Sequence, residues 1–289
     1  MNLSIAAAIL EATQVLRRAG VPEARREAGG LLESILGQDR TYLITNAGKL
    51  LDPAYLETFR EHVARRAHGE PLQYITGHQD FFGLDFDVTR DVLIPRPETE
   101  LLVETALDLI GGVEASPLIC DIGAGSGCIA IALLHERPRA RAIGVDISEA
   151  ALQVATRNAA RHGVKTRAAF VVADCLSAFQ GKTRFDLIVS NPPYVAEREL
   201  AGLQREVREH EPVVALTPGT DGLALIRKLL TDTPAYLVDG GYLLMEIGFN
   251  QRRAVEGLID PSVWTLLGVP ADLQGIPRTV VLQRLARTI

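Results

Sequence analysis

The chain has 289 residues, of which 47% are hydrophobic and 23% are charged, and its net charge is −6. This composition excludes a wholly disordered protein, and no apolar run approaches the roughly 18 residues that a membrane-spanning helix needs. The acidic balance argues against a protein whose main partner is bulk nucleic acid, because such binding depends on an excess of Lys and Arg. The start of the chain lacks a basic segment followed by an apolar one, so we expect a cytoplasmic protein.

Residues 1–73 predict a small all-helical domain, because apolar residues recur at steps of three and four. The first helix is expected to end at Gly20. The second takes Pro22 into its first turn and stops at Gly37. A third follows Asp52-Pro53. The charge of this region is balanced, so the acidic excess falls on the rest of the chain.

Residues 74–94 are extended and aromatic around Gly83, which favours a β-hairpin linker. Residues 95–289 then alternate apolar strands with helical segments. That alternation predicts an α/β domain, Rossmann-like, with a mostly parallel sheet covered on both faces. The expected strands are Leu118–Ile122, Ala142–Val145, Phe170–Val172, Phe185–Val189 and Tyr242–Ile247.

The first of these strands leads into a glycine loop, Gly123-Ala124-Gly125-Ser126-Gly127. Alternating glycines let the backbone turn tightly and let a ligand approach it closely. A dinucleotide site would place its third glycine three positions after the second, where Cys128 stands. The next strand ends at Asp146, whose carboxylate can accept hydrogen bonds from ribose hydroxyls, so the pattern favours S-adenosyl-L-methionine over NAD. The alternative is a plain strand-to-helix turn, with Asp146 capping the helix that starts near Ser148.

The tetrapeptide Asn191-Pro192-Pro193-Tyr194 follows another expected strand, at the sheet edge where ligands bind in open α/β folds. The Asn191 side-chain carbonyl and the Pro192 backbone carbonyl can each accept a hydrogen from an NH₂ group, and Tyr194 offers a flat ring face. Holding both N–H bonds points the nitrogen lone pair at a sulfonium methyl group and stabilises the developing positive charge. Asn191, Pro192 and Tyr194 are thus the predicted catalytic residues of a methyltransferase for planar amide or amino nitrogens. The competing interpretation is a rigid surface turn with a packed tyrosine.

Cysteine and histidine usage gives no sign of a disulfide framework or a metal centre. The three cysteines form no Cys-x-x-Cys pair, and the six histidines form no i, i+4 pair. Cys120 and Cys128 are predicted to be small core residues rather than nucleophiles. Glu246, within an apolar strand, is assigned no catalytic role. Residues 96–99 have two interpretations, closure over the methionine end of the cofactor or an ordinary helix start at Pro97.

The chain resembles the PrmC/HemK family, the peptide chain release factor N5-glutamine methyltransferases, over nearly its whole length. Besides the tetrapeptide, the resemblance rests on five segments: Gly69–Gly77, Phe81–Leu84, Val92–Glu100, Glu211-Pro212 and Asp221–Leu223. It implies a class I S-adenosylmethionine-dependent methyltransferase domain, preceded by a helical domain that helps to recognise the release factor and joined to it by the hairpin linker.

The resemblance also implies an activity and its residues. The enzyme would methylate N5 of the glutamine in the Gly-Gly-Gln motif of class I release factors, tuning translation termination and leaving S-adenosyl-L-homocysteine. Gly123 to Gly127, Asp146 and Asn191 would contact the cofactor, and Asn191 to Tyr194 would hold the glutamine. Cys175 stands where the family often has a bulkier side chain near the adenine. We expect a monomer, with no metal, no membrane and no direct requirement for nucleic acid.

Two other functions fit part of the pattern. An amino-methyltransferase acting on adenine in DNA or RNA uses the same planar NH₂ chemistry, but it needs a base-flipping pocket and usually a basic recognition surface. A regulator that binds the cofactor without catalysis would have no use for Asn191 and Tyr194. The acidic balance and the intact tetrapeptide disfavour both functions.

Overall fold

The computed structural model describes residues 3–179 and 183–286, and the chain divides into two compact units. The helical unit comprises Met1–His78 with Leu203–His210, and the sheet unit comprises Gln79–Gly202 with Glu211–Ile289. The first division falls inside the segment 74–94 predicted as a linker. No sequence pattern predicts the return of residues 203–210 to the first unit. Among the described residues, no helix has both the length and the apolar character to cross a membrane.

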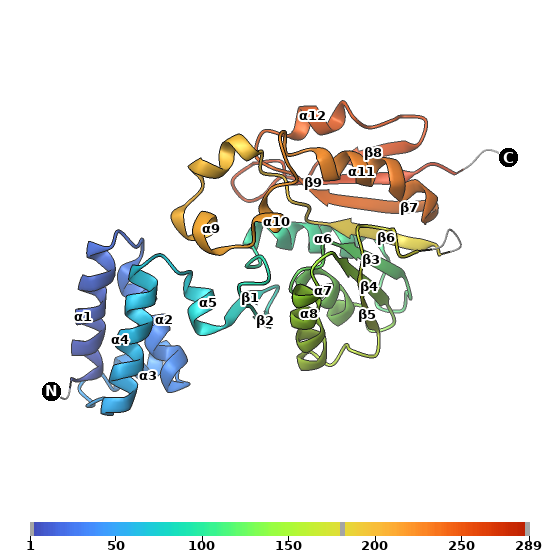
Figure 1. The fold of residues 1–289 in the computed structure, drawn as a ribbon. Helices are drawn as coiled ribbons and strands as arrows, with labels where there is room; N and C mark the ends of the chain where they lie inside the picture. The colour runs from blue at the N-terminus through green and yellow to red at the C-terminus, as the bar shows by residue number, and fades with distance from the viewer. Residues whose placement is uncertain (1–2, 180–182, 287–289) are drawn as a thin grey trace. The chain divides into compact units, whose positions relative to one another are not determined.

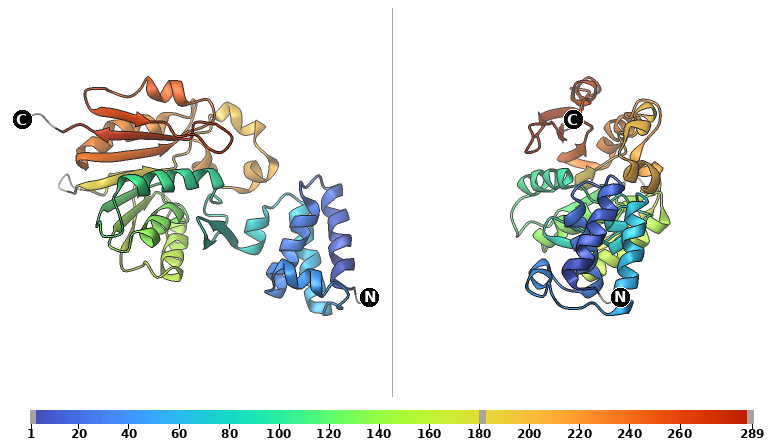
Figure 2. Two further views of the ribbon diagram at one scale, coloured as in Figure 1. Left: turned by 180° about the vertical axis from the view of Figure 1, so that it is seen from behind. Right: turned by 90° about the vertical axis from the view of Figure 1, so that its left-hand side faces the viewer.

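The described part of the helical unit consists of helices, and three of them pack side by side in Figures 1 and 2, namely α1, α2 and α4. They bury a shared core that includes Leu16, Leu32 and Phe59. Side chains of Ser4, Asp39 and Asp52 accept backbone N–H groups at helix starts, as good N-caps do. The helices are α1 (Ile5–Arg18), α2 (Ala24–Leu36), α3 (Arg40–Thr45), α4 (Pro53–Ala67), α5 (Leu72–Thr76) and α9 (Arg205–His210).

Three details of this unit differ from the prediction. Helix α2 begins at Ala24 after Glu23, whose φ of 51° breaks the helical path, so Pro22 lies outside the first turn. Helices α3 and α5 were not predicted, because five or six residues are too few to show a helical period. Helix α5 also occupies residues 72–76, where extended chain was expected from residue 74 onward.

Arg66 of α4 is a buried charge with partners on two other helices of the unit. Its side chain is 5% exposed, and its guanidinium contacts the carboxylate of Glu27 on α2. A second guanidinium nitrogen lies 2.6 Å from a carboxylate oxygen of Glu206 on α9. This ion pair ties the returning segment 203–210 to the helical unit.

Replacement of Arg66 by alanine should lower the free energy of unfolding by about 3 kcal/mol, because it leaves two carboxylates without their partner. Urea unfolding of the full chain measures the change. The matched control is Arg60→Ala, since Arg60 pairs with Glu11 at the surface, where the two side chains are 55% and 48% exposed. That loss should stay below about 1 kcal/mol. Equal losses in the two variants would contradict the role given to Arg66.

A short hairpin of β1 (His78–Phe81) and β2 (Leu84–Asp87) stands at the start of the sheet unit, and only its first residue, His78, is assigned to the helical unit. The hairpin lies within the segment predicted to form one. Its two turn residues, Phe82 and Gly83, both have positive φ, at 53° and 72°, as a tight two-residue hairpin turn requires.

A seven-stranded sheet in the order β5-β4-β3-β6-β7-β9-β8 forms the centre of this unit. Strands β3 to β7 run parallel, and β9 is antiparallel to both of its neighbours. The predicted mostly parallel sheet is thereby confirmed. The strands are β3 (Leu118–Ile122), β4 (Arg141–Asp146), β5 (Ala168–Val172), β6 (Phe185–Ser190), β7 (Leu237–Glu246), β8 (Trp264–Gly268) and β9 (Thr279–Arg284).

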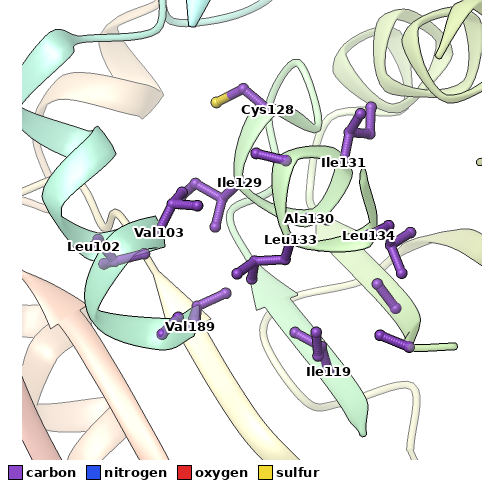
Figure 3. Packing of buried hydrophobic residues seen from close by; sticks show 14 of the residues in the cluster. Leu102, Val103, Ile119, Cys128, Ile129, Ala130, Ile131, Leu133, Leu134 and Val189 are labelled. Atoms are coloured by element: carbon purple, nitrogen blue, oxygen red, sulfur yellow. The ribbon is translucent and has the colours of Figure 1, made fainter. Parts of the chain in front are cut away.

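Helices cover both faces of the sheet, and neighbouring residues of one strand point into different cores. Ile119 of β3 packs with α6 and α7, whereas Cys120 packs with α11. Figure 3 shows the first core, in which residues of α6, α7, β3 and β6 meet. The helices are η1 (Pro97–Thr99), α6 (Glu100–Leu109), α7 (Cys128–Glu136), α8 (Glu149–Arg161), η2 (Glu197–Gly202), α10 (Val213–Leu216), α11 (Ala224–Asp232), η3 (Thr233–Ala235) and α12 (Arg252–Glu256).

The strand order reverses between β3 and β6, because β4 and β5 lie on one side of β3 while β6 and β7 lie on the other. Ile122 is aligned with Ser190 at the carboxyl ends of these two strands, and the Ser190 hydroxyl donates to the Ile122 carbonyl at 2.7 Å. The loops that leave β3 and β6 therefore diverge from neighbouring points. Such a switch point is where open α/β sheets bind their ligands.

Candidate active site

A cavity of about 370 Å³ opens at the carboxyl ends of β3, β4 and β6. This volume falls in the range of small-molecule sites. Most of the residues predicted from the sequence line it, namely Gly123, Ala124, Gly125, Ser126, Asp146, Cys175, Asn191 and Pro193. The other three predicted residues, Gly127, Pro192 and Tyr194, do not line the cavity themselves but are chain neighbours of residues that do.

The glycine loop follows β3, and the surroundings of its third glycine differ from those of the first two. Gly123, Gly125 and Gly127 all have positive φ, at 77°, 53° and 79°. A Cβ at Gly127 would lie 3.0 Å from the Ile131 side chain, whereas at Gly123 and Gly125 none would come closer than 3.9 Å to another atom. The first two glycines therefore present bare backbone at the cavity, and the third allows close packing beneath the loop.

Asp146 connects the glycine loop to the end of β4. Its Oδ2 accepts from the Gly125 N–H and its Oδ1 from the Ser148 N–H, both at 2.9 Å. The N-cap of α8 is Ser148, whose hydroxyl accepts from Ala151, so Asp146 is not the cap. A carboxylate has about four acceptor positions, and two remain for a ligand hydroxyl.

Asn191 and Tyr194 are joined through two residues that lie far away in the sequence. The Asn191 Nδ2 donates to Thr99 Oγ1 at 2.9 Å, and the Thr99 hydroxyl donates to Glu246 Oε2 at 2.6 Å. The other carboxylate oxygen, Oε1, accepts from the Tyr194 hydroxyl at 3.1 Å. Thr99 and Glu246 are buried, at 2% and 1% exposure. The sequence held one indication of this network, namely an acidic residue, Glu246, within an apolar strand. A buried acid needs hydrogen-bond partners.

Burial shifts the pKa values of the two ionisable groups in this network, Glu246 and Tyr194. Burial raises the pKa of Glu246, while the hydrogen bonds from Thr99 and Tyr194 and the charge of Arg278 oppose that rise. Burial also raises the pKa of Tyr194, and the neighbouring Glu246 acts in the same direction. Tyr194 therefore remains a neutral hydrogen-bond donor at neutral pH.

The backbone carbonyl of Tyr194 is contacted by the Gln251 side chain and closely approached by Gly222. Gln251 donates its side-chain NH₂ to the Tyr194 carbonyl at 2.9 Å and accepts from the Gly248 N–H at 2.8 Å. Gly222 has a φ of 73°, and a Cβ there would lie 2.3 Å from the same Tyr194 carbonyl oxygen. No side chain fits at position 222 without moving the tetrapeptide.

Gly222→Ala should therefore destabilise the chain by about 3 kcal/mol, as the sum of a left-handed backbone penalty and overpacking. It should also lower the rate of the predicted methyl transfer, because the added methyl group displaces the backbone of Tyr194. Urea unfolding and initial rates measure the two effects. The control is Gly202→Ala, an exposed position without positive φ and with open space around its Cβ. An alanine at residue 222 as well tolerated as the one at 202 would contradict this packing argument.

Residues 96–99 form the helix start predicted at Pro97, and closure over the methionine end of the cofactor stays a prediction. Pro97 begins η1, which continues into α6, while Arg96 and Thr99 line the cavity. The Arg96 guanidinium lies 2.5 Å from Glu211 Oε1, and Glu211 Oε2 accepts from the Ile94 N–H at 3.3 Å. Glu211, which is 4% exposed, thereby fixes the segment that leads into the site.

The three cysteines are buried thiols. Burial raises the pKa of Cys128 and of Cys175 to about 12, and that of Cys120 well above its ordinary value. All three therefore stay protonated at neutral pH and are poor nucleophiles. Cys128 and Cys175 nevertheless line the cavity, the latter with a left-handed φ of 50°. The contact of Cys175 with an adenine stays a prediction.

Comparisons with known proteins agree with this architecture. Residues 7–77 match the PrmC N-terminal domain, and residues 97–210 match the methyltransferase small domain. A protein of Koribacter versatilis named release factor glutamine methyltransferase is 45% identical over 92% of this chain and 93% of its own length. One of the same name from Geobacter sulfurreducens is 45% identical over 92% of this chain and 91% of its own. A methyltransferase of Pyrococcus furiosus shares the fold, with a TM-score of 0.53 at 15% identity over 78% of this chain and 99% of its own.

Proposed function

The chain belongs to the family of release factor glutamine methyltransferases, and from that premise we propose its reaction, substrate and methyl donor. It transfers a methyl group from S-adenosyl-L-methionine to N5 of the glutamine in the Gly-Gly-Gln motif of peptide chain release factors. The observation that carries this proposal is the position of Asn191, which lines the same cavity as the glycine loop and whose side-chain NH₂ is already bound to Thr99. Its side-chain carbonyl is left as an acceptor for the substrate.

The residues of the cavity suit this methyl donor. Gly123 and Gly125 offer backbone without side chains, and the Asp146 carboxylate retains acceptor positions for hydroxyl groups. S-adenosyl-L-methionine, when bound, supplies an electrophilic methyl group on a sulfonium sulfur. Arg96 at the same cavity is already paired with the buried Glu211, so we assign it to fixing the segment that enters the site.

The tetrapeptide would act by orientation and by its dipoles. An amide nitrogen is a weak nucleophile, because its lone pair is delocalised into the carbonyl. Acceptance of its two hydrogens by the Asn191 side-chain carbonyl and the Pro192 backbone carbonyl fixes the nitrogen and stabilises the positive charge that develops on it. Tyr194 adjoins the cavity through Pro193 without lining it, and its ring would provide a flat wall for the amide plane. The protonated cysteines offer no thiolate for a covalent step, so we assign direct transfer to the nitrogen. The new N–C bond would replace the S–C bond of the donor, and the nitrogen would lose one of its two protons as S-adenosyl-L-homocysteine leaves.

Incubation of the protein with labelled S-adenosyl-L-methionine and a class I release factor tests this proposal. Mass spectrometry should place one methyl group on the glutamine of the Gly-Gly-Gln motif, and a release factor with glutamate at that position should stay unlabelled. Label found only in added nucleic acid would identify an adenine amino-methyltransferase instead. Binding of the cofactor without transfer to either substrate would identify a regulator.

A further inference from the structure

We propose that Glu246 and Thr99 are positioning residues, which determine the end of the Asn191 side-chain amide that faces the reacting nitrogen. The inference rests on the proposed function, because it concerns how the tetrapeptide holds an NH₂ group. From the sequence, Glu246 received no catalytic role and Thr99 was considered only as part of the segment 96–99. Both belong to the buried hydrogen-bond network described above.

The orientation of Asn191 follows from counting hydrogens. The two ends of an asparagine amide have nearly the same shape, but one donates and the other accepts. The Thr99 hydroxyl has a single hydrogen, and its oxygen lies 2.6 Å from the Glu246 carboxylate. Both oxygens of the Glu246 carboxyl group accept, Oε2 from the Thr99 hydroxyl and Oε1 from the Tyr194 hydroxyl, so the Thr99 hydrogen goes to Glu246. The Thr99 oxygen then accepts from Asn191, which turns Nδ2 toward Thr99 and leaves Oδ1 for the substrate.

The opposite orientation of the Asn191 amide would prevent binding of the substrate NH₂ group. If the Asn191 amide turned around, its NH₂ group would meet the NH₂ group of the substrate, and two donors cannot form a hydrogen bond with each other. The same carboxylate also holds the Tyr194 hydroxyl, so one buried group positions both ends of the tetrapeptide. Two charged groups also affect the pKa of Glu246: Arg278 lowers it and Glu98 raises it. Arg278 is itself paired with Asp272 at 2.9 Å, so the orienting contacts remain those with Thr99 and Tyr194.

Two substitutions at Thr99 separate orientation from shape. Thr99→Val has nearly the same shape without a hydroxyl, and Thr99→Ser keeps the hydroxyl. We expect Thr99→Val to lower kcat for glutamine methylation at least tenfold, with KM for the release factor changed less than about threefold, because the loss falls on the transition state. Thr99→Ser should retain kcat within about threefold of the wild type. Glu246→Gln should resemble Thr99→Val, because its NH₂ group can donate to Thr99 and free the threonine hydrogen to turn toward Asn191.

A measurement without turnover tests the same inference. In protein labelled with ¹⁵N-asparagine, the side-chain NH₂ signals of Asn191, assigned by their absence in Asn191→Asp, should shift and exchange faster in Thr99→Val but not in Thr99→Ser. If the wild type methylates the release factor while Thr99→Val and Thr99→Ser have equal kcat and equal NH₂ signals, the inference is wrong. If the wild type transfers no methyl group to the release factor, the proposed function fails, and the NH₂ signals still decide the orientation of Asn191.

Discussion

Asn191→Ala should lower kcat for glutamine methylation by about a thousandfold, the largest effect that we expect from a single substitution. Removal of one preorganised hydrogen-bonding group from an active site costs on the order of a hundred- to a thousandfold in rate. We expect the loss for Asn191→Ala at the upper end of this range, because the Asn191 side-chain carbonyl would both orient the nitrogen and stabilise its developing charge. Single-turnover methylation of a release factor at saturating S-adenosyl-L-methionine measures the loss.

The affinity for the cofactor separates this effect from a damaged site. Calorimetric titration with S-adenosyl-L-homocysteine should give a dissociation constant within about tenfold of the wild type, because the glycine loop and Asp146 remain. Asn46→Ala is the matched control, since Asn46 makes its side-chain hydrogen bonds near the end of α3 in the helical unit. A kcat for Asn191→Ala as high as that of Asn46→Ala would remove Asn191 from the mechanism.

Asp121 should make the stability of the protein depend on pH. This carboxyl group is fully buried, its Oδ2 accepts from the Ala130 N–H at 3.1 Å, and its Oδ1 has no hydrogen-bond partner among the described residues. Burial raises the pKa of Asp121 from 3.8 to about 7, and the negative charge of Asp146 adds to the rise. The folded protein therefore holds a proton here that the unfolded chain releases near pH 4.

The sign of the effect follows from this difference in proton binding. Below pH 4 both states are protonated and the favourable contribution is complete, and it is lost as the pH rises toward 7. The loss amounts to roughly 4 kcal/mol, at about 1.4 kcal/mol for each unit of pKa. Urea unfolding between pH 4 and 8 should show a steeper decline for the wild type than for Asp121→Asn. Asp108→Asn, exposed on α6, should decline like the wild type. Parallel curves for the wild type and Asp121→Asn would contradict the buried proton.

The sequence predicted the parts of the site that are local in the chain. The glycine loop and the tetrapeptide each follow an apolar strand, and the carboxyl ends of parallel strands meet at one edge of a sheet. Gly123, Asp146 and Asn191 could therefore be placed together from the sequence alone. Strands β8 and β9 were not predicted. Most residues of β8 are exposed and give no apolar run, whereas β9 has a buried apolar run that was not recognised as a strand.

The parts that were missed depend on contacts between distant residues. Glu246 bonds to Thr99 across 147 positions, and Thr99 to Asn191 across 92. No local period records which residue will satisfy a buried acid. The role of Gly222 was equally invisible, because it depends on the carbonyl of Tyr194 coming within reach of a side chain that is not there. The sequence indicates that such residues are unusual, but only the fold shows what they touch.

The return of residues 203–210 to the helical unit has a consequence for synthesis of the chain on the ribosome. Helices α1 to α5 are complete when residue 76 has been made, yet Glu206, one of the two carboxylates around Arg66, is added more than a hundred residues later. A contact of such long sequence separation forms slowly, because a large loop has to close first. We expect the nascent helical unit to pair Arg66 with Glu27 early and to reach its final stability only after the chain has passed residue 210. Its maturation is therefore coupled in time to the sheet unit, whose strands β3 to β6 are made in between.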